Sequence, residues 1–144
     1  AYCHLAHNVT VGDYVIMSNV ATLAGHVTVE DRAVIGGLAA VHQFCRIGKF
    51  AMIGGCSKVV QDVPPFMMAD GNPAETRTIN KVGMERHGVS EAAIAALKQC
   101  YRILFREGLT IPNALGKIEQ EVQPLTEVAQ LVAFVRSSER GISK

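Results

Sequence analysis

The stretch from Leu5 to Pro64 repeats every six residues without a break, and this period constrains the fold more than any other feature. A period of six matches neither an amphipathic helix nor a hairpin array, but it is typical of a parallel β-helix built from hexapeptides. The fifth position of each hexad is small or β-branched, and the second is mostly Gly, Ala or Ser. The first position is always aliphatic: Leu5, Val11, Met17, Leu23, Val29, Ile35, Val41, Ile47, Ile53 and Val59.

Three hexads make one coil of a triangular β-helix, so residues 18 positions apart lie on successive coils. Neighbouring strands lie about 4.8 Å apart, and the stacked first positions therefore form a continuous core. Small residues such as Cys45 occupy the corners, where larger side chains would clash. We predict a mainly β fold, a hexapeptide-repeat parallel β-helix, over residues 1–65.

The repeat ends at Pro64-Pro65, because consecutive prolines cannot donate to a strand ladder. Residues 66–89 are predicted to be a connector with a turn at 71–73. Residues 90–144 are predicted to be a helical region that caps the β-helix. Its helices are expected from Ser90 to about Glu107, from about Pro112, and from Pro124 to Gly141.

The chain opens within a hexad, because Ala1 to His4 resemble the end of one. A solenoid needs capping repeats that protect its exposed strand edges. We therefore expect these residues to be the C-terminal part of a longer β-helix.

Charge and composition limit the classes of partner. The chain has 14 Lys and Arg against 13 Asp and Glu, a net charge of +1, which favours neither nucleic acid nor an anionic membrane. No apolar run approaches the roughly 18 residues of a membrane span, and no secretory signal is present. The four cysteines lack the spacing of a zinc or redox site. We expect reduced cysteines in a cytoplasmic protein without a cofactor.

Histidines gather along one edge of the predicted β-helix. Steps of 18 place His7, Gly25 and Gln43 in one column, Asn8, His26 and Phe44 in the next, and His42 beside them. A histidine can take a proton from a hydroxyl, and a glycine N–H can face a developing oxyanion. This pair is the minimum for direct acyl transfer. Two other readings stay open: imidazoles that simply line a polar edge, and a histidine metal site.

Several motifs occur in succession: His4-Leu-Ala-His7, Ala24-Gly25-His26-Val27, Ala40-Val41-His42-Gln43-Phe44, Gln61-Asp62-Val63-Pro64-Pro65, and Asn80-x-x-Gly83-x-x-Arg86-x-Gly88. Together they resemble the C-terminal half of the acyl-carrier-protein–UDP-N-acetylglucosamine O-acyltransferases of lipid A biosynthesis. The resemblance covers essentially the whole chain.

The resemblance implies a left-handed β-helix, a homotrimer and transfer of a 3-hydroxyacyl group from acyl carrier protein to the 3-hydroxyl of UDP-N-acetylglucosamine. It implies that His7 is the general base and that Gly25 stabilises the oxyanion. It places His4, Asn8, His26, His42, Gln43, Gly55, Asn80 and Arg86 around the substrates. Among these, Gly55 lies along the acyl groove, and Asn80 and Arg86 contact the nucleotide, whose diphosphate suits a guanidinium.

One departure concerns the residue after the base, which is commonly Asp in the family and is Asn8 here. An amide can hold the imidazole tautomer but cannot offset the charge of an imidazolium. Three alternative functions remain: an amino-sugar N-acyltransferase, a metal-dependent lyase on the same scaffold, and a non-catalytic trimeric fragment that binds acyl carrier protein.

Overall fold

Ten two-residue strands wind the N-terminal part of the chain into parallel coils. The computed structural model describes all residues 1–144. The strands are β1 (His4–Leu5), β2 (Thr10–Val11), β3 (Ile16–Met17), β4 (Thr22–Leu23), β5 (Thr28–Val29), β6 (Val34–Ile35), β7 (Ala40–Val41), β8 (Arg46–Ile47), β9 (Met52–Ile53) and β10 (Lys58–Val59). They form three faces: a first sheet β1-β4-β7-β10, a second β2-β5-β8, and a third containing β3-β6-β9. The predicted parallel β-helix is confirmed.

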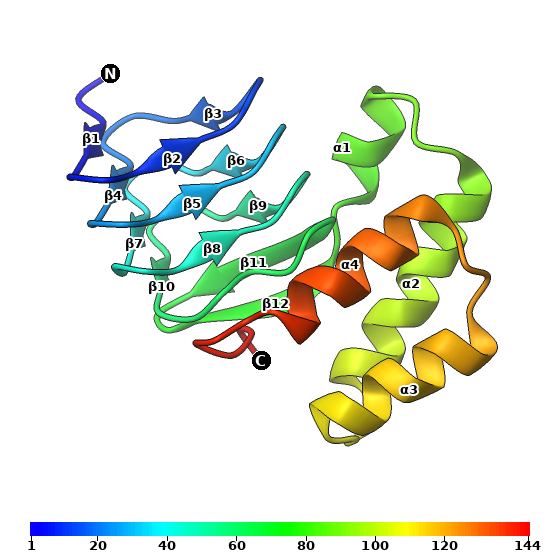
Figure 1. Cartoon of the computed structure of the whole chain (residues 1–144). Helices are drawn as coiled ribbons and strands as arrows, with labels where there is room; N and C mark the ends of the chain where they lie inside the picture. Colours follow the sequence, from blue (N-terminus) through cyan, green and yellow to red (C-terminus); the bar gives the residue numbers. More distant parts are fainter.

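The register between coils is 18 residues throughout. His4 pairs with Thr22, and Thr22 in turn pairs with Ala40. The aliphatic first positions point inward, and from Leu23 onward they are almost completely buried. In the first coil Leu5 is 51% exposed, because it lies at the end of the stack. In Figure 1 the coils run from the N-terminus, in blue, toward the green strands at the opposite end.

Each corner of the solenoid contains a non-glycine residue in the left-handed backbone region. These residues recur every six positions: Tyr2, Asn8, Tyr14, Val20, His26, Arg32, Leu38, Phe44, Phe50 and Cys56. From Val20 onward their N–H groups donate to carbonyls on the neighbouring coil, as His26 does to His7 at 3.0 Å. Left-handed backbone costs an L-residue roughly 1–2 kcal/mol. From Val20 onward the bonds between coils stabilise a conformation that residues such as Val20 and Leu38 do not favour locally.

Residues 66–89, which we expected to be a connector, contain a hairpin and a short helix. Strand β11 (Met67–Gly71) pairs in parallel with β9, and β12 (Ala74–Ile79) pairs antiparallel with β11. The hairpin thus extends the third sheet, and the turn expected at 71–73 joins its strands. Helix α1 (Lys81–Arg86) follows.

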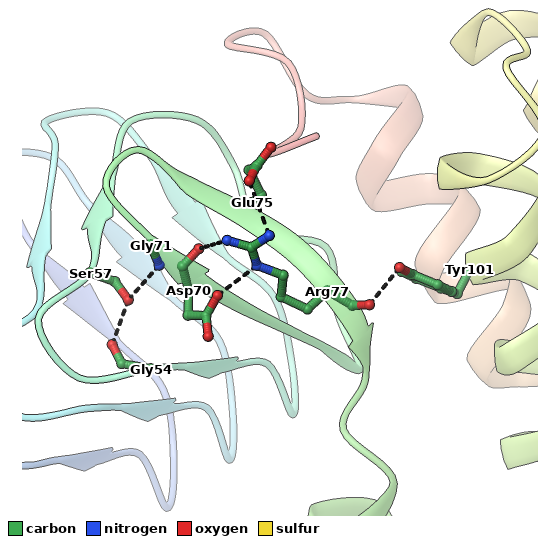
Figure 2. Close-up of polar contacts among 7 residues, drawn as sticks. All are labelled: Gly54, Ser57, Asp70, Gly71, Glu75, Arg77 and Tyr101. Atoms are coloured by element: carbon green, nitrogen blue, oxygen red, sulfur yellow. Dashed lines mark hydrogen bonds and ion pairs between the residues drawn. The ribbon is translucent and has the colours of Figure 1, made fainter.

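A polar network joins this hairpin to the last coil and to the helices (Figure 2). The Ser57 hydroxyl donates to the Gly54 carbonyl at 2.7 Å and accepts from the Gly71 N–H at 3.2 Å. Arg77 Nε donates to Asp70 at 2.6 Å, while the Tyr101 hydroxyl donates to the Arg77 carbonyl at 2.5 Å. The hairpin is therefore bonded to the solenoid on one side and to a helix on the other.

Three amphipathic helices make a second core beside the last coils (Figure 1): α2 (Glu91–Phe105), α3 (Ile111–Glu121) and α4 (Thr126–Arg136). The expected start at Ser90 is confirmed, because its hydroxyl accepts from the Ala93 N–H at 3.1 Å. The expected end of α4 at Gly141 is wrong. No helix in the structure has both the length and the apolar character needed to cross a membrane.

Helix α4 ends early because the chain after it returns to the solenoid. Asp62 is 1% exposed, and its carboxylate accepts from the Arg46 N–H at 2.8 Å and from the Ser138 hydroxyl at 2.6 Å. Asp62 also forms a parallel bridge with Ile142. These bonds fix residues 138–142 in a non-helical path along the last coil, with bends at 139–140, so the helix cannot continue.

Candidate active site

The predicted site residues lie at different corners of the triangular coil. The turns between the first and second sheets form the histidine corner, which contains His7, Asn8, Gly25, His26, Gln43 and Phe44. The turns between the third and first sheets form the glycine corner, which contains Asn19, Gly37 and Gly55. The remaining turns form the Arg32 corner, which contains Asp13, Tyr14, Asp31, Arg32, Lys49 and Phe50.

At the histidine corner, the imidazole of His7 is exposed and oriented by its neighbour. Its Nδ1 lies 3.3 Å from Asn8 Oδ1. An amide oxygen only accepts, so this contact requires a proton on Nδ1 and leaves Nε2 free to take one. The left-handed backbone of Asn8, with φ of 59°, turns its side chain toward this ring, and Asn is among the residues that adopt that conformation most readily.

Gly25 lies one coil away, directly against the His7 ring. A Cβ atom at this position would be 2.8 Å from His7 Cε1 and 2.9 Å from Nε2, closer than real side chains approach. The Gly25 N–H donates to no group of the chain. Equivalent turn N–H groups at Asp13 and Lys49 are occupied by the carboxylates of Asp31 and Glu30, at 2.7 and 3.0 Å. The Gly25 N–H is thus available to a developing oxyanion beside a base.

The other residues of this corner surround the pair. The rings of His7 and His26 meet edge to face with centroids 5.0 Å apart, and His26 stacks on Phe44 at 4.8 Å. His42 Nδ1 lies 3.1 Å from the Gln43 carbonyl oxygen. His4, on β1, is exposed on the adjoining first sheet.

A cavity of about 510 Å³ opens beside the histidine corner on the second sheet. His26, Phe44, Arg46 and Arg140 contribute to its walls. Sequence reasoning missed both arginines. Arg46 follows Thr28 by 18 positions, so the column arithmetic could have placed it; Arg140 carries no such signal, because it comes from the segment after α4.

Gly55 lies at the glycine corner, stacked on Gly37. A Cβ added to Gly55 would be 3.2 Å from the Gly37 carbonyl oxygen, and one added to Gly37 would be 3.3 Å from the Asn19 carbonyl oxygen. The two stacked glycines therefore leave positions 37 and 55 of this edge without side chains. The first sheet separates this edge from His7 within one chain.

Asn80 precedes α1 as its N-cap and Arg86 ends it, and the helix is attached to the Arg32 corner. Asn80 is 5% exposed; its amide donates to the Phe50 carbonyl at 2.9 Å and accepts from the Gly83 N–H at 3.2 Å. It thus caps α1 and joins it to the solenoid. Arg86 is exposed in the last turn of α1 and has no ion-pair partner within the chain.

A metal site at the histidines would require several ligand side chains close together. The chain contains no group of three or more His, Cys, Asp or Glu side chains placed to hold an ion. The histidines of this corner instead contact an amide, a carbonyl and each other's rings.

The stacked coils, the helical region and the histidine corner define a hexapeptide-repeat β-solenoid with a C-terminal helical region. A family profile described as "UDP N-acetylglucosamine O-acyltransferase; Domain 2" matches residues 62–143. The chain therefore belongs to the UDP-N-acetylglucosamine O-acyltransferase family.

Relatives and solved structures agree with this membership. The chain is 51% identical over 144 residues to the acyl-[acyl-carrier-protein]–UDP-N-acetylglucosamine O-acyltransferase of Thermodesulfovibrio yellowstonii, covering all of this chain and 56% of that protein. The enzyme of the same name from Thiobacillus denitrificans is 47% identical over 142 residues, covering 99% of this chain and 55% of that protein. The chain thus spans just over half the length of these curated relatives.

Among solved structures, LpxA from Acinetobacter baumannii superposes with a TM-score of 0.94 at 41% identity, covering 99% of this chain and 55% of that one. LpxA from Bacteroides fragilis, described as a UDP-N-acetylglucosamine acyltransferase, gives 0.97 at 37% identity, covering 99% and 56%.

Proposed function

We propose that this chain carries the catalytic corner of an enzyme that transfers a 3-hydroxyacyl group from acyl carrier protein to the 3-hydroxyl of UDP-N-acetylglucosamine. The observation that carries this proposal is the position of Gly25 directly against Nε2 of His7. The family description and the relatives' names support acyl carrier protein and UDP-N-acetylglucosamine as the substrates, while the 3-hydroxyacyl group and the 3-hydroxyl come from the resemblance described above.

In the proposed reaction, His7 Nε2 takes the proton of the sugar hydroxyl as its oxygen attacks the thioester carbonyl. The new C–O bond leaves negative charge on the carbonyl oxygen, which accepts from the Gly25 N–H. Collapse of this intermediate breaks the C–S bond, and the imidazolium returns its proton to the leaving thiolate. Asn8 holds the Nδ1 proton throughout, without a charge to stabilise the imidazolium.

The arrangement of the corners supports a homotrimer. The base, the edge without side chains at Gly55 and the α1 residues Asn80 and Arg86 lie at three separate corners of one chain. The substrates include a sugar, a long acyl chain and a nucleotide, and they must contact all three corners. They can do so only if corners of neighbouring copies lie beside the histidine corner. A closed three-fold ring does this with one repeated interface.

Within that assembly we assign the remaining contacts. His4, His26, His42 and Gln43 bind around the sugar and the thioester, because they share the base's edge. The acyl chain lies along Gly37 and Gly55, where no side chain obstructs it. Arg86 binds the nucleotide phosphates, while Asn80 positions α1.

The test is steady-state acyl transfer by the full-length protein that contains this chain. The variant His7→Ala should lower kcat about 10²–10⁴-fold, the usual contribution of a general base. Lys58→Ala, an exposed change on the first sheet, is the control and should leave kcat unchanged. An acceptor with a 3-amino group in place of the hydroxyl measures the preference for O- over N-acylation. Undiminished turnover by His7→Ala would remove this histidine from the reaction.

A further inference from the structure

A second cavity, of about 440 Å³, lies at the Arg32 corner, away from the histidine corner. Its walls come from the solenoid, from residues 87–90 between α1 and α2, and from the N-terminal part of α4. The charged or titratable side chains that line it are Arg32, Lys49, His87 and Glu127. None of them belongs to the residues assigned above.

Arg32 is held in place without a carboxylate. Its Nη1 lies 3.0 Å from His87 Nδ1, and its guanidinium carbon is 4.5 Å from the Tyr14 ring centroid. Because Arg only donates, His87 accepts through Nδ1 in this contact. Neither the imidazole nor the phenol ring neutralises the guanidinium, so Arg32 keeps its charge and its remaining N–H groups.

The carboxylates nearest in sequence are committed to the backbone. Glu30 accepts from the Lys49 N–H at 3.0 Å, and Asp31 accepts from the Asp13 N–H at 2.7 Å. Neither Arg32 nor Lys49 forms an ion pair within the chain, and both residues are half-buried. The cavity thus has two half-buried cations, and Glu127 is its only acidic lining residue.

We propose that Arg32 and Lys49 form a phosphate-binding site for the substrates, with His87 as the residue that positions Arg32. A guanidinium presents a planar fork that matches two phosphate oxygens, and an ammonium adds a point charge. The ligand chemistry is a phosphate ester or diphosphate. It has two sources in the proposed reaction: the diphosphate of the nucleotide sugar and the phosphate of the carrier's pantetheine arm. The identity of the ligand rests on the proposed function, whereas the geometry of the site does not.

The first test measures pyrophosphate binding to the full-length protein by calorimetry at fixed ionic strength. Arg32→Ala should weaken binding about tenfold or more, since hydrogen bonds to charged groups are the strong ones. Arg32→Gln repeats the measurement with the stem of the side chain retained. Lys58→Ala removes one positive charge from an exposed position on the first sheet and should leave pyrophosphate affinity unchanged.

The positioning role of His87 has its own readout. His87→Ala should weaken pyrophosphate binding less than Arg32→Ala does, because the guanidinium remains but loses its acceptor. His87→Gln restores an acceptor oxygen and should recover part of the affinity. A purely structural role would give equal losses in both variants together with lowered thermal stability.

The two sources are separated by repeating the titration with UDP and with 4′-phosphopantetheine. If Arg32→Ala weakens only one of them, that molecule supplies the phosphate. If Arg32→Ala and Arg32→Gln bind pyrophosphate, UDP and 4′-phosphopantetheine as wild type does, the site is refuted. These titrations need no turnover, so a full-length protein that binds through Arg32 but fails to transfer an acyl group would refute only the proposed function.

Discussion

The substitution Gly25→Ala tests whether the approach of this backbone to His7 controls the reaction. The added Cβ would be 2.8 Å from His7 Cε1 and 2.9 Å from Nε2. The backbone of Gly25 is outside the left-handed region, so alanine adopts it without strain. The cost therefore falls on the imidazole, which is exposed and contacts Asn8 and the ring of His26.

The size of the effect follows from the displacement. Carbon atoms in ordinary contact are about 3.5 Å apart or more, so the ring must retreat by roughly 0.7 Å. A misplacement of about 1 Å costs about 10²-fold in rate, and we therefore expect kcat to fall by about 10- to 10²-fold. Stability should not fall, because a Gly→Ala change at an unstrained position favours the folded state by about 0.4–1 kcal/mol.

The assay is kcat of the full-length protein together with its thermal midpoint. Gly116→Ala is the control, since Gly116 lies on α3, outside the proposed site, and no atom lies within 4 Å of the added Cβ. It should leave the distance between His7 and Gly25 unchanged and preserve kcat. A Gly25→Ala protein with wild-type kcat would refute the idea that the close approach of Gly25 to His7 controls the rate.

Three further predictions concern other parts of the molecule. Gly55→Met should shift the donor preference toward shorter acyl chains, measured by competition between donors of different length, because its side chain fills an edge that two stacked glycines leave open. Asp62→Ala should lower the free energy of unfolding by about 2–4 kcal/mol in urea, because the Ser138 hydroxyl and a backbone N–H lose a charged acceptor. Burial raises the pKa of Cys45 from 9.0 to about 11 and that of Cys100 to about 12. Above pH 9 the unfolded thiols ionise while the folded ones stay neutral, so stability should fall from pH 9 to about 11 through Cys45 and to about 12 through Cys100.

Controls separate each of these effects from a general loss of structure. Gly116→Ala, where no atom lies within 4 Å of the added Cβ, should leave the chain-length profile unchanged. Glu139→Ala changes an exposed acid near Asp62 and should alter stability little. Replacing Cys45 or Cys100 by alanine should flatten the fall of the thermal midpoint above pH 9; an unchanged slope would mean that other groups cause it. An unaltered chain-length profile in Gly55→Met would place the acyl chain elsewhere.

Much of the fold was predictable because its main signal is local and repeated. The aliphatic residue every six positions depends only on neighbouring sequence, and it gave the coil and the 18-residue register that pairs His4 with Thr22. The starts of the helices were also readable, since Ser90 caps α2 through a bond three residues away. The hairpin at 67–79 was missed because β11 pairs with β9 rather than continuing the hexad pattern.

The candidate site was likewise predictable from the sequence only where it follows the repeat. The column of His7, Gly25 and Gln43 follows from arithmetic on the repeat, so the sequence placed the base beside the glycine. It did not reveal that Asn80 is buried as a helix cap, because its partner is the carbonyl of Phe50, 30 residues earlier. Nor did it indicate Arg32, whose partner His87 is 55 positions away.

By itself, then, the sequence determined what depends on regular spacing: the solenoid, its inward face and the edge on which the histidines stack. The tertiary structure decided what depends on the path of the chain between distant residues. It set the left-handed corners, which bonds between coils impose on residues such as Val20 against their preference. It also fixed the end of α4, where Ser138 binds Asp62 across 76 positions, because a contact of that separation leaves no local pattern in the chain.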